Sequence, residues 1–171
     1  AVGTPETQIT TYTYDAENNL IEVLDAEGHT ATHAYDRVYN RIAVTDGNGH
    51  TTSYAFDAVN RMLEALDAEG GKTTYTYDAV GNRISVTDAN GHALAAAAPT
   101  EAEKAAALEA HTTHYAYDER NQLITETDAH DVATSYRYDR LGNLIEMTRA
   151  AGTLDAQTTT YVYNDDDQLI E

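Results

Sequence analysis

The stretch Tyr75-Thr-Tyr77-Asp78-Ala-Val-Gly81-Asn82-Arg83-Ile84 decides the fold of this chain. Its two tyrosines are two positions apart, and alternate side chains of a strand share a face, so both rings lie on one side of an extended segment. Turn residues follow, because Gly tolerates positive φ and Asp and Asn bond to nearby backbone groups. Apolar residues then return at alternate positions, Ile84 and Val86, which indicates a second strand. The stretch therefore predicts a β-hairpin.

The same pattern recurs along the chain and defines repeats one to seven. Their aromatic pairs, with one histidine substitute, are Tyr12/Tyr14, His33/Tyr35, Tyr54/Phe56, Tyr75/Tyr77, Tyr115/Tyr117, Tyr136/Tyr138 and Tyr161/Tyr163. Consecutive pairs are 21 residues apart, except for steps of 40 between repeats four and five and 25 between repeats six and seven. These exceptions are one period plus 19 and one period plus 4, so they indicate insertions. A fixed period of this length is typical of repeat architectures.

A second turn closes each of the first four repeats. The turn sequences are Asp25-Ala-Glu-Gly28, Asp46-Gly-Asn-Gly49, Asp67-Ala-Glu-Gly70 and Asp88-Ala-Asn-Gly91. Each places Gly where a left-handed backbone is least costly, and Thr-rich sequence then leads into the next strand. The predicted fold class is all-β, with tandem β-hairpin repeats forming a curled antiparallel strip, either a spiral or a partial shell. Curling is expected because open sheets of more than about ten strands rarely stay flat.

The segment between repeats four and five differs from the rest in being rich in alanine. Thr100 and Glu103 form a capping-box pattern ahead of several alanines, which predicts one short helix at about 101–110. With only Leu94 and Leu108 as large apolar residues, this segment would either cover a sheet opening or edge or project as a contact site. The expected organisation is a lead-in at 1–9, repeats one to four at 10–92, a helical insertion at 93–111 and repeats five to seven at 112–171.

Bulk composition alone would predict disorder. The net charge is -19 and large aliphatic residues are few, as in chains that cannot bury enough apolar surface to fold. The 13 tyrosines argue against disorder, because a regularly placed Tyr can bury its ring and still reach a partner with its hydroxyl. We therefore expect the repeat aromatics to form the packed side of the sheet. They are Tyr12, Tyr14, Tyr35, Tyr54, Phe56, Tyr75, Tyr77, Tyr115, Tyr117, Tyr136, Tyr138, Tyr161 and Tyr163.

The acidic charge balance restricts the partners. With 29 Asp and Glu against 10 Lys and Arg, the chain repels phosphate backbones and anionic headgroups, so we expect no binding to nucleic acid. No apolar stretch approaches the length of a membrane span, so we expect no membrane insertion. The absence of Cys excludes disulfides and thiolate metal sites.

The residues that could form small-ligand sites have simpler explanations. The Asp-rich turns lack the ligand spacing of calcium loops, and Asp in turns commonly accepts backbone hydrogen bonds instead. His29, His50 and His92 follow the glycine turns and could bind zinc or sense pH, but exposed turn histidines are the simpler interpretation. No polar cluster outside the repeats supports a catalytic Asp-His pair. We therefore predict no catalytic residue, no metal, no cofactor and no enzymatic activity.

The quoted stretch and its copies closely resemble the Rhs/YD-repeat family, whose pattern is Tyr-Asp, a short turn with Gly-Asn, then Arg or Leu and an apolar residue. The resemblance implies a β-strip that spirals into a hollow shell. In bacterial polymorphic and insecticidal toxins such a shell encloses a C-terminal toxic polypeptide, and in animal teneurins it is an extracellular adhesion shell. The toxin-associated members carry a self-cleaving segment with an Asp-Pro motif, whereas Pro5 and Pro99 here follow Thr4 and Ala98.

The resemblance implies a non-catalytic scaffold, a fragment or short array of such a shell in a secreted or cell-surface bacterial protein. Its partners would be neighbouring repeats or copies of the same chain through strand pairing, or an enclosed passenger polypeptide. Edge strands near Tyr12 and Leu169 could also pair head to tail and build a filament. The alternative is a carbohydrate-binding or adhesion module, which Tyr rings exposed in a groove would favour.

Overall fold

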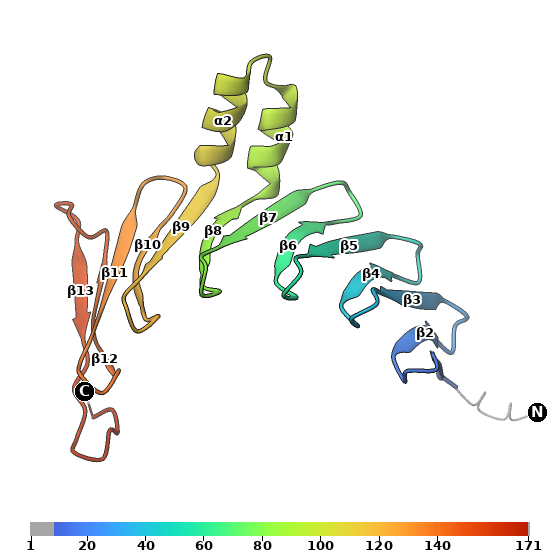
Figure 1. Cartoon of the computed structure of the whole chain (residues 1–171), viewed down its shortest axis with the longest axis horizontal. Helices are drawn as coiled ribbons and strands as arrows, with labels where there is room; N and C mark the ends of the chain where they lie inside the picture. The colour runs from blue at the N-terminus through green and yellow to red at the C-terminus, as the bar shows by residue number, and fades with distance from the viewer. Residues whose placement is uncertain (1–8, 171) are drawn as a thin grey trace, which may run out of the picture. The chain divides into compact units, whose positions relative to one another are not determined.

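The computed structural model describes residues 9–170, which form thirteen strands and two helices (Figure 1). The strands are β1 (Thr11–Tyr14), β2 (Leu20–Leu24), β3 (Thr30–Tyr35), β4 (Arg41–Thr45), β5 (Thr51–Phe56), β6 (Met62–Leu66), β7 (Lys72–Tyr77), β8 (Arg83–Thr87), β9 (Thr112–Tyr117), β10 (Leu123–Thr127), β11 (Ala133–Tyr138), β12 (Leu144–Arg149) and β13 (Gln157–Thr160). They follow chain order from β1 to β13 in one open sheet. The predicted all-β class with tandem hairpins is confirmed. The chain divides into two compact units, one ending at Lys72 and the other beginning at Thr73.

Strands pair over a longer stretch within a Tyr-Asp hairpin than between consecutive hairpins. In the first unit, β3 pairs with β4 from Thr32↔Thr45 to Tyr35↔Arg41, with a register shift beside Tyr35. The next pair, β4 and β5, is matched at three positions that end at Ala43. In the second unit, β8–β9 and β10–β11 are likewise matched at three positions each. The backbone ladder between repeats therefore stops before it reaches the Tyr-Asp turns, and side chains must complete the contact there.

One turn geometry closes both ends of the hairpins. At Asp36 the amide of Tyr39 donates to the Asp carbonyl, and the Asp Oδ1 accepts from the amides of Val38 and Asn40. The turn at Asp46 repeats these bonds, with Gly49 in place of Tyr39. The fourth residue of each turn has a positive φ, 69° at Tyr39 and 86° at Gly49. The Tyr-Asp turn and the glycine turn, which differ in sequence, are therefore the same structural element.

The insertion contains two helices, α1 (Ala89–Ala97) and α2 (Glu101–Glu109), where one was expected. The capping box at Thr100 and Glu103 is formed, as predicted for α2. The turn predicted at Asp88–Gly91 is wrong, because Asp88 instead caps α1 by accepting from the Gly91 amide. An Asp carboxylate can accept from nearby amides both in a tight turn and at a helix N-terminus, so the sequence did not distinguish the two.

The helical pair extends away from the ends of β8 and β9 rather than over the neighbouring strands (Figure 1). A role of the insertion as a contact site or as a cover for a sheet edge stays a prediction. Neither helix, nor any other in the described part of the chain, is long and apolar enough to cross a membrane.

Burial is shallow throughout the described residues. Ala95, in α1, is the buried hydrophobic side chain and Thr112, at the start of β9, is the buried polar one. Most strand residues are half-buried, as expected when a sheet has no second layer of secondary structure packed on it.

Candidate functional site

The aromatic residues of the repeats lie on one face of the sheet together with aliphatic residues of the partner strands. In β7–β8, Tyr75 lies opposite Val86 while Thr76 lies opposite Ser85, and directly opposed residues share a face. The half-buried aromatics are Tyr35, Tyr54, Phe56, Tyr75, Tyr77, Tyr115, Tyr117, Tyr136, Tyr138, Tyr161 and Tyr163. Tyr12 and Tyr14, in β1, are 56% and 52% exposed. We call this the aromatic face.

In repeats two, five and seven, the second tyrosine bonds to the backbone of the preceding repeat. Its hydroxyl donates to a carbonyl at the start of that repeat's second strand, and we call this bond the tyrosine bridge. The bridges join Tyr35 to Leu20 at 3.0 Å, Tyr117 to Arg83 at 3.0 Å and Tyr163 to Leu144 at 3.1 Å. Each lies where the backbone ladder between repeats has stopped, so it gives a partner to a carbonyl that the ladder does not reach.

Neighbouring Tyr-Asp turns are also joined through side-chain amides. The pairs are Asn40 Nδ2 to Asn60 Oδ1 at 2.9 Å, Asn82 Nδ2 to Asn121 Oδ1 at 2.9 Å, and Asn143 Nδ2 to Asp167 Oδ1 at 3.0 Å. In each pair the acceptor belongs to the positive-φ residue of the following turn. This set of bonds fixes the spacing of consecutive turns.

Hydrogen bonds lower the pKa of several turn carboxylates and so favour their charged form. The amide side chain of Asn40 lowers the pKa of Asp36, and the backbone amide of His29 lowers the pKa of Asp25. Hydrogen bonds that stabilise a carboxylate lower its pKa. These aspartates are thus committed to their own turns.

Two recesses occupy corresponding places between consecutive repeats. The smaller, of about 370 Å³, lies between repeats one and two, and the larger, of about 570 Å³, between repeats five and six. The larger recess is lined by Asp118, Arg120, Gln122, Ile124, Tyr136, Arg137, Tyr138, Asp139 and Arg140. Each of these residues is 103 positions after a residue of the smaller recess, as Asp118 is after Asp15 and Tyr138 after Tyr35. The recess is therefore a feature of the repeat.

The two recesses differ in their polar residues. Arg120 of the larger corresponds to Glu17 of the smaller, and Tyr136 corresponds to His33. The Nδ1 atom of His33 is buried without a hydrogen-bond partner. The sequence analysis assigned no role in a recess to Arg120 or to His33, although each departs from the commonest residue at its repeat position.

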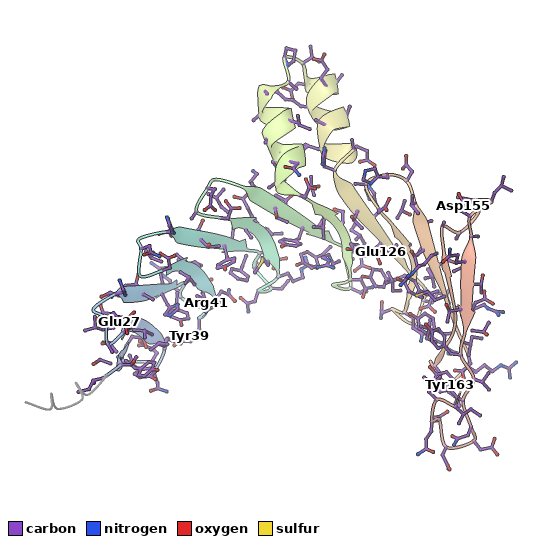
Figure 2. All side chains as sticks on the ribbon, turned by 180° about the vertical axis from the view of Figure 1, so that it is seen from behind. Glu27, Tyr39, Arg41, Glu126, Asp155 and Tyr163 are labelled. Carbon is purple, nitrogen blue, oxygen red and sulfur yellow. The ribbon has the colours of Figure 1, made fainter. Side chains whose placement is uncertain are left out.

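Glu126 is a charged residue on the aromatic face that the sequence analysis did not single out. Glu126 (labelled in Figure 2) lies in β10 opposite Tyr115, where repeats one to four and six have an apolar residue. Its Oε2 accepts from the Tyr136 hydroxyl at 3.3 Å. Burial raises the pKa of Tyr136, and the nearby Glu126 charge raises that pKa further. The break in apolar alternation at Glu126 was the available sequence signal.

The histidines after the glycine turns bond to the turn aspartates. His29 Nδ1 is 3.0 Å from Asp25 Oδ2, and His50 Nδ1 is 3.3 Å from Asp46 Oδ2. His92 does not share this position, since it lies in α1 and contacts Thr74 Oγ1 at 3.0 Å. His111 takes the corresponding place, with Nδ1 3.3 Å from Asp88 Oδ1.

A cluster of possible metal ligands lies at the first glycine turn. Ligand atoms of Asp25, Glu27 and His29 lie within 4.8 Å of one another. Asp25 already accepts from the amides of Glu27 and His29, so the turn itself explains the cluster and we assign no metal to it.

Comparison with known proteins gives a consistent picture. The RHS Repeat family model matches residues 1–30, 14–51, 35–72, 56–93 and 117–154. The crystal structure of TcdB2-TccC3 without its hypervariable C-terminal region aligns with a TM-score of 0.59 and 18% identity, covering 98% of this chain and 10% of that one. A structure of the Photorhabdus luminescens Tc holotoxin pore aligns with a TM-score of 0.57 and 19% identity, covering 94% and 10%.

At this identity the structural likeness concerns the fold, and the chain spans about a tenth of the length of the solved chains it matches. No curated protein matches it significantly in sequence.

Proposed function

This chain belongs to the RHS repeat family, and from that premise we propose that it is part of the wall of an RHS-type β-shell that encloses or presents a passenger polypeptide. The observation that carries the proposal is the tyrosine bridge, exemplified by Tyr35 and Leu20. A wall one sheet thick must hold consecutive hairpins together without a second layer behind it. The bridges and the amide bonds between turns do so at the end of the hairpins where the backbone ladder is missing.

The two faces of such a wall differ in chemistry. On the aromatic face, Tyr75 and Val86 are half-buried, and on the opposite face the hydroxyls of Thr76 and Ser85 lie 2.6 Å apart. Half-buried rings gain further stabilisation when more polypeptide covers them. We propose that the aromatic positions pack the wall and that the wall acts by enclosure, without catalysis.

The proposed partners follow from the strand order. β1 and β13 each have a single strand neighbour in the described sheet. Unpaired strand edges bind further strands through their backbone groups. We propose that these edges pair with neighbouring repeats or with copies of the same chain, in a secreted or cell-surface bacterial protein.

The carbohydrate-binding alternative depends on exposed Tyr rings. The aromatic-face tyrosines that follow the first strand are half-buried, and three of them use their hydroxyls in bridges. These features favour packing over sugar stacking, so the wall remains the proposed function.

Two single-cysteine variants test the proposal, since the chain has no native Cys. Val86→Cys places a thiol on the aromatic face and Ser85→Cys places one on the opposite face of the same strand. In the natural polypeptide that contains this chain, a wall exposes one face to a bulky maleimide-polyethylene glycol reagent and protects the other. The 171-residue chain alone is the control and should react at both positions. Equal labelling of both faces in the natural polypeptide would contradict enclosure.

A further inference from the structure

We propose that the larger recess, between repeats five and six, binds a carboxylate side chain of an acidic peptide segment. This goes beyond the role of the wall, because it assigns a ligand to one place on it. The inference rests on the difference between this recess and its counterpart between repeats one and two.

The larger recess has an open tyrosine bridge. In the smaller recess the Tyr35 hydroxyl bonds to the Leu20 carbonyl at 3.0 Å. The corresponding groups between repeats five and six are the Tyr138 hydroxyl, which lines the larger recess, and the Leu123 carbonyl, and the described chain contains no bond between them. The volume rises from about 370 to about 570 Å³. The recess thus presents the Tyr138 hydroxyl, whose counterparts Tyr35, Tyr117 and Tyr163 use their hydroxyls in bridges.

The larger recess also holds two arginines with unused donors. Arg120 donates through Nη1 to the Arg140 carbonyl at 2.9 Å, and its other guanidinium donors have no partner in the described chain. The Arg140 guanidinium has no partner there either. Arg137 is already paired with Glu146 at 2.8 Å. A guanidinium binds carboxylates through charge-assisted and often bidentate hydrogen bonds, so Arg120 and Arg140 suit a carboxylate.

The acidic residues around the recess do not occupy these donors. Asp118 Oδ1 accepts from the amides of Arg120 and Gln122 in its own turn. Asp139 Oδ1 likewise accepts from the Asn143 amide, and this bond lowers the pKa of Asp139. Glu126 bonds to the Tyr136 hydroxyl and is not part of the lining. The lining therefore combines unused guanidinium donors with two carboxylates whose Oδ1 atoms are committed to turns. Burial raises the pKa of Tyr138, and the nearby Asp118 charge raises that pKa further.

An acidic residue of a peptide suits this lining. It offers a carboxylate to the Arg120 and Arg140 guanidinium groups and to the Tyr138 hydroxyl. Ile124 and the rings of Tyr136 and Tyr138 can cover its methylene groups.

The test is fluorescence anisotropy of the full chain with a labelled Gly-Glu-Leu-Glu-Gly peptide. We expect binding that Arg120→Gln with Arg140→Gln weakens by about tenfold or more, since the bonds lost are charge-assisted. Tyr138→Phe should weaken binding by a smaller factor while retaining the ring. The matched control is Arg37→Gln in the smaller recess, which corresponds to Arg140 and should leave binding unchanged. Circular dichroism verifies that each variant is folded.

The proposal would be overturned by no binding to the folded chain, by equal binding of the Gln-for-Glu peptide, or by equal weakening by Arg37→Gln. Preferential binding of a uronate oligosaccharide in competition would also overturn it, by identifying a carbohydrate site. None of these measurements depends on whether the natural polypeptide forms a closed wall.

Discussion

The hydroxyl of Tyr35 donates a hydrogen bond to the carbonyl of Leu20, 3.0 Å away in the preceding repeat. The two residues are 15 positions apart. The same bond joins Tyr117 to Arg83 across 34 positions and Tyr163 to Leu144 across 19, because insertions lie between them. The bond therefore follows the place of the residue in the repeat rather than a fixed distance along the chain.

Removing or adding one hydroxyl should change stability in opposite directions. Tyr35→Phe deletes the bridge and should lower the free energy of unfolding by about 1 kcal/mol, the usual net value of one hydrogen bond. Phe56 lies 15 residues after Arg41, so Phe56→Tyr should form a new bridge to that carbonyl and raise the free energy by a similar amount. Urea unfolding of both variants measures this. If the two substitutions changed the free energy of unfolding equally and in the same direction, the assignment of the tyrosine bridge would be refuted.

The turn aspartate should be sensitive to loss of its carboxylate. Asp36→Ala removes the acceptor for the amides of Val38 and Asn40 and for the Asn40 side chain. We expect a lower melting temperature, and a smaller decrease for Asp36→Asn, which keeps one acceptor oxygen. Arg37→Ala, at the next and exposed position, is the control and should have little effect. The result to check is that the melting temperature of Asp36→Ala is lower than that of Asp36→Asn.

Acid should destabilise the array. Hydrogen bonds within the turns lower the pKa of Asp15, Asp25, Asp36, Asp46 and Asp139 below the usual 3.8. The unfolded chain then binds more protons than the folded one, so stability present above pH 3.8 is lost as pH falls through the lowered values. Thermal unfolding at pH 7, 4 and 2.5 should show most of the loss in the last interval. A melting temperature unchanged at pH 2.5 would show that the carboxylates contribute little.

The sequence predicted the repeating unit well because its signals are local. The pair Tyr75 and Tyr77 marks a face, Gly81 marks a positive φ, and both are set by residues within one hairpin. Features that join hairpins were not predicted. The open bridge at Tyr138 and the unpartnered Nδ1 of His33 depend on how far neighbouring strands separate, which no single repeat encodes. The helix α1 was missed because Asp88 has the same sequence context as a turn aspartate.

The capping box should control the second helix. Thr100 accepts from the Glu103 amide, and Glu103 accepts from the Thr100 amide at 3.1 Å. Thr100→Ala should destabilise α2 by about 1 kcal/mol, as loss of an N-cap usually does. Hydrogen exchange of the α2 amides measures the local effect, and Thr100→Ser should preserve protection. Equal exchange in the two variants would mean that the box contributes nothing.

Gly91 should resist a substitution that normally favours helices. Replacing Gly by Ala within a helix stabilises it by roughly 0.5–1 kcal/mol. A Cβ at Gly91, however, would lie 2.6 Å from His111 Cβ, so Gly91→Ala should lower stability instead. Adding His111→Gly to Gly91→Ala should relieve the contact. Thermal melts of the two variants beside the single His111→Gly protein separate the effects. Stabilisation by Gly91→Ala alone would show that the contact relaxes freely.

The strands on either side of the helical pair keep the ordinary pairing of the array. β8 and β9 match at three positions, as do β4 and β5, which are joined by a tight turn. The connection between hairpins can therefore grow without changing the register of the strands it connects. Lineages carrying this repeat can acquire new segments at these connections while conserving the strand count, and a designer can graft a foreign sequence there with the same expectation.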